Sequence, residues 1–122
     1  MNWQDIKHFK SREFDSPDQP GSGQYMNEYL IKTLDKIRDE YGYPIKVTSG
    51  YRTPEHNARV GGEPNSEHMR GMAVDIEAPT SQARYALKRL AYKFGIQRIG
   101  NGKDFIHLGV SVSLPQNVEW NY

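Results

Sequence analysis

Two stretches of the chain predict amphipathic helices, because apolar residues recur in them every three or four positions. The first stretch begins at Met26 and continues through Leu30, Leu34, Ile37 and Tyr41. The second contains Ala83, Leu87, Leu90 and Phe94. A glycine follows each pattern directly, Gly42 and Gly95, as is typical of the residue that ends a helix. A third, short helix is expected after the turn at Thr53-Pro54, running through Asn57 to Val60.

Strands are predicted where apolar and polar residues alternate or where β-branched and aromatic residues gather. The segment 45–49 alternates, and so does 72–77, which places Asp75 on the face opposite Val74. Two further strands, 97–100 and 105–108, flank Asn101-Gly102, a strong signal for a hairpin turn. His107 then lies on the returning strand of this hairpin.

These elements predict an α+β protein with a small antiparallel sheet and helices packed on it. A length of 122 residues fits one domain covering 1–122. Residues 1–25 are expected to form a loop-rich N-terminal arm, because 16–23 is rich in proline, glycine and serine. Residues 113–122 are expected to form a C-terminal tail that Trp120 and Tyr122 tether to the body.

Composition excludes several classes of function. The net charge of +1 gives no electrostatic basis for binding nucleic acid. The chain has no cysteine, so any metal ion has to be held by nitrogen and oxygen ligands. The first residues lack the apolar segment of a signal peptide, and no run approaches the roughly 20 apolar residues of a membrane span. We therefore expect no membrane association, and a protein that is made in the cytoplasm without a signal peptide.

The candidate chemistry lies in the stretch 66–75. His68 and Asp75 stand seven positions apart with Gly71 between them, and His107 follows on a later predicted strand. A catalytic zinc ion commonly takes three protein ligands of these types and keeps a fourth position for water. Isolated histidines and aspartates are common on protein surfaces, so a small α+β domain without metal stays open as an interpretation from these residue types alone.

Three motifs together give a more specific indication, and the chain resembles the zinc D-Ala-D-Ala carboxypeptidase group of metallopeptidases, also called LAS-type peptidases. This group takes in vancomycin-resistance dipeptidases, certain phage endolysins and the zinc-site fold of hedgehog signalling domains. The motifs are Ser49-Gly50-Tyr51-Arg52, Ser66-x-His68-x-x-Gly71-x-Ala73-x-Asp75 and Asp104-x-x-His107. The order and the spacing of all three agree with those of the group.

The resemblance implies a hedgehog-like or D,D-peptidase-like fold in which His68, Asp75 and His107 hold Zn²⁺. It implies that Asp104 acts as general base and that Arg52 binds a carboxylate of the substrate. Ser66 lies near the substrate in relatives, while Tyr51 could line the cleft or belong to the core.

Two points stay open at the site. Glu67 and Glu77 are alternative general bases if Asp104 does not serve. One departure from the pattern concerns the last ligand, because short members commonly read His-x-Asp where this chain reads His107-Leu108-Gly109. That aspartate is expected to orient a ligand, so Gly109 removes a support of the metal site.

The resemblance thus predicts a zinc peptidase, expected as a monomer, that hydrolyses peptidoglycan stem peptides through a metal-activated water. It would be a D-Ala-D-Ala carboxypeptidase or an L-Ala-D-Glu-type endopeptidase. It would act on the cell wall after lysis or after delivery to the wall. Association of the protein with a phage is one expected setting. The alternative from another class is a zinc-bearing binding or phage structural module of the same fold without turnover.

Overall fold

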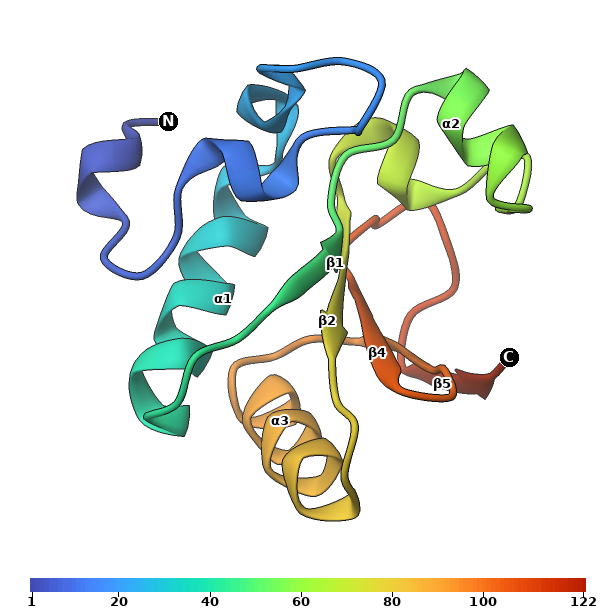
Figure 1. Cartoon of the computed structure of the whole chain (residues 1–122). Helices are drawn as coiled ribbons and strands as arrows, with labels where there is room; N and C mark the ends of the chain where they lie inside the picture. The colour runs from blue at the N-terminus through green and yellow to red at the C-terminus, as the bar shows by residue number, and fades with distance from the viewer.

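The computed structural model describes residues 1–122 and contains three α-helices, four short 3-10 helices and one sheet (Figure 1). The α-helices are α1 (Glu28–Tyr41), α2 (Pro54–Arg59) and α3 (Ser81–Lys93). The strands are β1 (Val47–Ser49), β2 (Ala73–Glu77), β3 (Arg98–Asn101), β4 (Phe105–Gly109) and β5 (Val118–Asn121). The 3-10 helices are η1 (Trp3–Asp5), η2 (Ser11–Phe14), η3 (Ser22–Tyr25) and η4 (Glu67–Arg70). The predicted α+β class is confirmed, and no helix has both the length and the apolar character that a bilayer span needs.

The sheet has the strand order β1-β2-β4-β3-β5. The first four strands pair antiparallel, as expected, but β5 runs parallel to β3, with Trp120 opposite Gly100. Val118–Asn121, within the expected C-terminal tail, is a strand of the sheet, and Trp120 and Tyr122 pack on His107 and Phe105. Four residues are too few to show an alternating pattern, so only the tertiary pairing reveals this strand.

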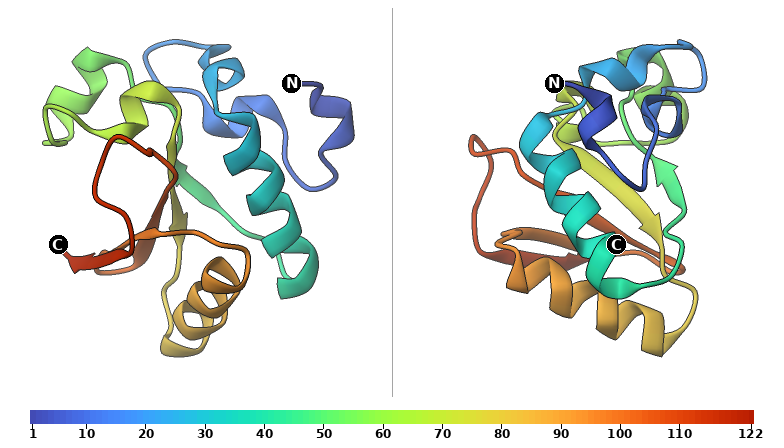
Figure 2. Two further views of the ribbon diagram at one scale, coloured as in Figure 1. Left: turned by 180° about the vertical axis from the view of Figure 1, so that it is seen from behind. Right: turned by 90° about the vertical axis from the view of Figure 1, so that its left-hand side faces the viewer.

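The sheet separates a hydrophobic core from the face that carries the candidate site. Val74 and Ile76 are fully buried among residues of α1 and α3, whereas Asp75 points to the opposite face. In Figure 2 both long helices lie on the same side of the strands. The core draws on the arm, the helices and the sheet, and includes Ile6, Phe9, Phe14, Leu30, Leu34, Ile37, Leu87, Leu90, Ile99, Ile106 and Leu108.

The two long helices lie where their apolar patterns predict, although α1 begins at Glu28, two residues after Met26. The Asn27 side chain accepts a hydrogen bond of 3.0 Å from the Leu30 backbone N–H, and Thr80 caps α3 in the same way. Gly42 follows α1 with a φ of 79°, in the left-handed region that favours glycine. Local sequence signals therefore define both helices.

The hairpin turn between β3 and β4 lies two residues later than expected. Asn101 still pairs with Ile106, and the Gly102 N–H donates to the Phe105 carbonyl at 2.9 Å, so Lys103 and Asp104 form the turn. The prediction of an Asn101-Gly102 turn is wrong, since Asn101 is the last residue of β3 and pairs with Ile106 of β4 and Asn121 of β5. Asp104 does lie at the turn, where the alternation of side chains is broken.

The N-terminal arm packs against the segment that carries the first motif. Phe9 and Phe14 are buried, as expected for its anchors. The Phe14 carbonyl accepts a hydrogen bond from Tyr51 N–H at 2.9 Å, and the Ser16 hydroxyl accepts one from Thr53 N–H at 3.2 Å. The arm is irregular except for its single-turn 3-10 helices, and η3 starts inside the expected loop, at Ser22.

Glu119 connects β5 to α3, and its removal should weaken this connection in a pH-dependent way. Its carboxylate accepts hydrogen bonds from Lys88 at 2.6 Å, from the Tyr92 hydroxyl and from Asn101, and these contacts lower the pKa of Glu119 to about 2. Because that pKa lies below the ordinary value of 4.5, the stabilisation is complete above about pH 5 and is lost as the pH falls towards 2. Glu119→Gln should cost roughly 1 kcal/mol of unfolding free energy at pH 7.

Urea unfolding at pH 7 and pH 3 tests this expectation. The difference between the wild type and Glu119→Gln should shrink at the lower pH. Glu55→Gln is the control, because Glu55 is exposed on α2 and has no bonded partner. A difference that is the same at both pH values would contradict the assignment.

Candidate metal centre and its cleft

The structure brings together three residues that the sequence singles out as metal ligands. Asp75 and His107 lie opposite each other on β2 and β4, and His68 reaches them from η4. One potential ligand atom from each residue lies within 4.8 Å of the other two, and all three residues are buried. Asp75 Oδ1 is 3.2 Å from His68 Nε2 and 3.0 Å from His107 Nδ1. The two distances from Asp75 are close to the roughly 3.3 Å between ligand atoms of a tetrahedral zinc site.

Hydrogen bonds on the far side of each ring set which nitrogen faces the site. His68 Nδ1 lies 2.8 Å from the Gly50 carbonyl, which can only accept, so the ring proton is on Nδ1 and Nε2 keeps its lone pair. His107 Nε2 lies 2.7 Å from Glu67 Oε2 and donates to it, which leaves Nδ1 for the site. Each ring therefore directs its other nitrogen, His68 Nε2 or His107 Nδ1, at the Asp75 carboxylate, and a shared cation would bind these two nitrogens in their unprotonated form.

The protonation of Asp75 and His68 suits a cation, whereas that of His107 opposes one. Burial alone would raise the pKa of Asp75, but hydrogen bonds from His107 and His68 outweigh it and hold that pKa well below its usual range. Burial lowers the pKa of His68 and so favours the neutral imidazole. Burial acts in the same direction on His107, but its hydrogen bonds to Asp75 and Glu67 raise its pKa overall. A metal ion bound at His107 Nδ1 would have to displace a proton there.

Arg52 lies beside the cluster on the segment that follows β1. Its guanidinium donates to Ser49 Oγ at 2.9 Å, to Asn57 Oδ1 at 3.2 Å and to Asp75 Oδ2 at 3.2 Å. Burial lowers its pKa, while the charge of Asp75 opposes this change, and an arginine stays protonated at neutral pH in any case. Five N–H groups are available and three are engaged, so the guanidinium can still bind an anionic group in the cleft.

The second motif forms a turn that leads directly into β2. Ser66 caps η4 by accepting a 3.2 Å hydrogen bond from His68 N–H. Gly71 ends η4 with a φ of 70°, and a Cβ at this position would overlap the Tyr25 carbonyl. The seven positions from His68 to Asp75 thus consist of the rest of η4, the turn at Gly71 and the first residues of β2.

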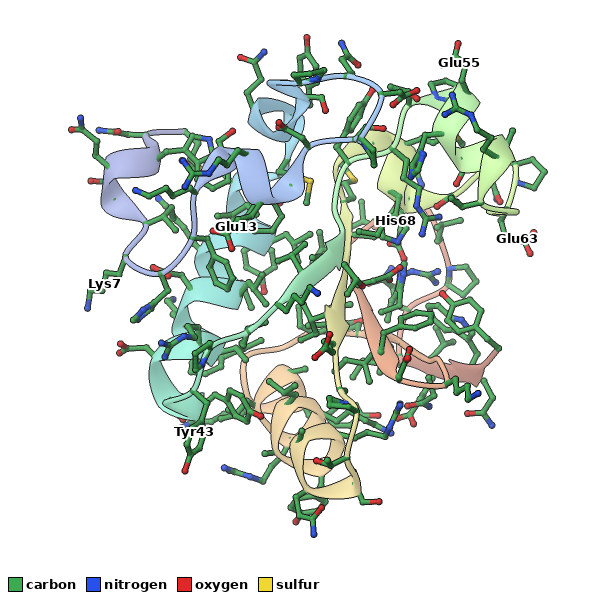
Figure 3. The ribbon with its side chains drawn as sticks, in the orientation of Figure 1. Lys7, Glu13, Tyr43, Glu55, Glu63 and His68 are labelled. Atoms are coloured by element: carbon green, nitrogen blue, oxygen red, sulfur yellow. The ribbon has the colours of Figure 1, made fainter.

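The cluster lies in a cleft of about 600 Å³. Figure 3 shows His68 close to the strands, below the turn that bears it, and Glu63 on the loop beyond α2 that borders the cleft. Three aromatic residues, Phe105, Trp120 and Tyr122, also line the cleft. Trp120 lies over the His107 ring with 5.3 Å between ring centroids. The sheet and the loops thus enclose the three ligands on several sides.

Three predicted site residues lie in different surroundings from those of the cluster. Asp104 is exposed in the β3–β4 turn, its carboxylate makes no hydrogen bond, and it does not line the cleft. Tyr51 packs on Tyr25 with 5.4 Å between ring centroids and contacts the core, so its place favours a structural role. Glu77 is exposed near Lys46 and lies outside the cleft. Ser66, by contrast, does line the cleft.

Sequence reasoning missed the contribution of Arg98 and gave Glu67 only the role of an alternative base. Glu67 is 2% exposed and accepts hydrogen bonds from Arg98 Nε at 3.1 Å and from Ser111 N–H at 3.1 Å. A Cβ at Gly109 would overlap the Glu67 carboxylate, so no side chain can stand there beside it. Gly109 is the last residue of β4 and pairs with both Ala73 and Arg98, and a glycine at such a paired position was the available signal of a close approach.

Comparisons with known proteins agree with this geometry. The family model of peptidase M15 matches residues 7–109. Among solved structures, the L-Ala D-Glu endopeptidase ChiX of Serratia marcescens has a TM-score of 0.55 and 21% sequence identity, over 92% of this chain and 97% of that chain. Curated proteins give no match. Peptidases of this family depend on a metal ion, and the His-Asp-His cluster could bind one. The resemblance seen in the three motifs is thus confirmed, and the chain belongs to the peptidase M15 family.

Proposed function

We propose that this protein is a zinc metallopeptidase that hydrolyses peptidoglycan stem peptides. The observation that carries the proposal is the convergence of two imidazole nitrogens and one carboxylate in a cleft, next to Arg52. The donor set of two nitrogens and one oxygen fits Zn²⁺ with one position left open. We further propose that the enzyme acts as a monomer on the cell wall, after lysis or delivery by a phage.

Each residue of the site would contribute a separate part of the chemistry. A bound Zn²⁺ would supply a water of lowered pKa and would polarise the scissile carbonyl. Arg52 would bind a substrate carboxylate with the N–H groups that its protein partners leave free. Asp104 would take the proton of the attacking water and return it to the leaving amine, which requires the β3–β4 turn to move towards the bound substrate. Ser66 would contact the peptide at the rim.

The bond to be cleaved is proposed from the similar structure. ChiX is described as an L-Ala D-Glu endopeptidase, and Arg52 would suit the free carboxylate of D-Glu in such a substrate. A terminal D-Ala-D-Ala also presents a carboxylate, so a D,D-carboxypeptidase is the other candidate. Incubation of the zinc-loaded protein with purified sacculi and with defined muropeptides, followed by mass spectrometry, tests both. Release of L-Ala-terminated fragments supports the endopeptidase, and loss of one D-Ala supports the carboxypeptidase.

The position of Asp104 favours a second candidate function, a zinc-bearing binding or phage structural module without turnover. Asp104 is exposed outside the cleft, and a general base has to reach the attacking water. The two functions differ in one observable, because a module would retain zinc and bind muropeptides without cleaving them.

Replacement of Asp104 by asparagine separates the two candidates. If Asp104 is the base, Asp104→Asn should lower kcat by on the order of 10² to 10⁴ while zinc content stays the same. Asp5→Asn is a matched control that should leave kcat unchanged. Asp5 lies in η1, is exposed, and is distant in sequence from the three ligands. Zinc binding without cleavage by the wild type would favour the module. Equal activity of the wild type and Asp104→Asn would remove Asp104 from the mechanism.

A further inference from the structure

Glu67 is the acidic residue closest to the ligand cluster that does not belong to it. It is adjacent to His68 in sequence, yet its carboxylate contacts the other histidine, at 2.7 Å from His107 Nε2. Asp75 lies 3.0 Å from Nδ1 on the opposite side of the same ring. The His107 imidazole is therefore held between two carboxylates, one that faces the proposed metal and one that faces away from it.

The Glu67 carboxylate is itself fixed by donors on the protein side. Arg98 Nε lies 3.2 Å and 3.1 Å from its two oxygens, and Ser111 N–H donates to it at 3.1 Å. Arg98 is fixed in turn by the Pro115 carbonyl at 2.7 Å and by the Trp120 ring. These contacts occupy the acceptor positions of Glu67, so this carboxylate is not free to take a proton from an attacking water.

Gly109 shows how closely Glu67 fills this space. Residues 107 and 109 of β4 point to the same face of the sheet, and β4 brings position 109 next to the ring that Glu67 contacts. A Cβ built at position 109 would overlap both carboxylate oxygens of Glu67. The fold therefore has room for one carboxylate behind His107, and it could be supplied from position 67 or from position 109.

We propose that Glu67 is a positioning residue of the metal site and holds His107 with Nδ1 directed at the cation. The absence of a side chain at Gly109 leaves the space that the Glu67 carboxylate occupies. This inference rests on the proposed zinc site. A carboxylate behind a metal-bound imidazole fixes the ring proton on the outer nitrogen, restricts ring rotation and strengthens the imidazole as a ligand. The same task could be performed by an aspartate at position 109 once Glu67 is removed.

Zinc dissociation constants from chelator competition test the proposal in five proteins: the wild type, Glu67→Ala, Glu67→Gln, Glu67→Ala/Gly109→Asp and Glu63→Gln. Loss of the carboxylate in Glu67→Ala should weaken zinc binding by about 10-fold to 100-fold. The double variant should recover at least half of this loss on a logarithmic scale. Glu63→Gln removes a negative charge from the same cleft without touching His107 and should leave the zinc affinity within about threefold of the wild type.

A second readout separates positioning from general stability. In the zinc-loaded wild type, histidine-selective NMR should show a slowly exchanging, downfield imidazole N–H for His107 Nε2. This signal should be absent in Glu67→Ala and should return in the double variant. Glu67→Gln, which keeps an uncharged acceptor of the same shape, should retain the signal with weaker zinc binding.

The outcomes distinguish this inference from the proposed function. A wild type that binds no stoichiometric zinc contradicts the proposed function itself. A wild type that binds zinc, with equal affinity in Glu67→Ala, overturns the inference alone. If Glu67→Ala does not fold, the comparison is made with Glu67→Gln, and a folded double variant that binds zinc no better than Glu67→Gln and lacks the N–H signal also overturns it.

Discussion

Substitution of His68 by alanine should abolish stoichiometric zinc binding and lower kcat/KM for stem-peptide hydrolysis by on the order of 10³-fold or more. His68 contributes one of three ligand atoms that lie within 4.8 Å of one another, so its loss leaves two ligands and an enlarged opening. His68 Nδ1 also bonds the Gly50 carbonyl, and its removal leaves this buried acceptor without its partner. Zinc content by elemental analysis and fragment release from sacculi measure the two effects.

The matched control is His56→Ala. His56 lies on α2, and it is not part of the ligand cluster. This variant should keep the zinc content and the activity of the wild type. Equal and negligible zinc in the wild type and in His68→Ala would instead indicate a small α+β domain without metal.

Gly71→Ala should be the most destabilising of the glycine substitutions near the site, at about 3 kcal/mol of unfolding free energy. Two causes add at this position. A φ of 70° is strained for any residue with a Cβ, and that Cβ would overlap the Tyr25 carbonyl. Urea denaturation monitored by circular dichroism measures the change, and zinc affinity should fall with it because η4 carries His68.

Gly42→Ala separates these two causes. Gly42 has a φ of 79°, but no atom lies within 4 Å of a Cβ built there. This variant therefore experiences the backbone strain alone and should lose about 1 kcal/mol. A cost at Gly71 no larger than that at Gly42 would show that the Tyr25 carbonyl moves aside at little expense.

The parts of the fold that sequence predicts well depend on local signals. Gly42 marks the end of α1, and the alternation of Val74 and Ile76 with Asp75 is enough to assign the two faces of β2. The errors occur where long-range contacts decide. Val118–Asn121 is a strand through its parallel pairing with β3, and the hairpin turn is displaced because Asn101 still pairs within the sheet.

The candidate site divides in the same way. The motifs identify His68, Asp75 and His107, and the structure brings them together because β2 and β4 pair with Asp75 opposite His107. The role of Glu67 depends on a contact with His107, 40 positions away, which spacing along the chain does not reveal. The place of Asp104 outside the cleft is likewise a property of the turn and not of the Asp-x-x-His spacing.

The strand order β1-β2-β4-β3-β5 has a consequence for how the protein opens. Because β2 and β4 are both flanked by other strands, the amide hydrogens beside Asp75 and His107 should exchange with solvent among the slowest in the chain. The segment 60–66, which lies in irregular structure on the rim, should exchange quickly. Such a contrast would mean that the paired strands keep Asp75 and His107, two of the three ligands, in place while the rim fluctuates.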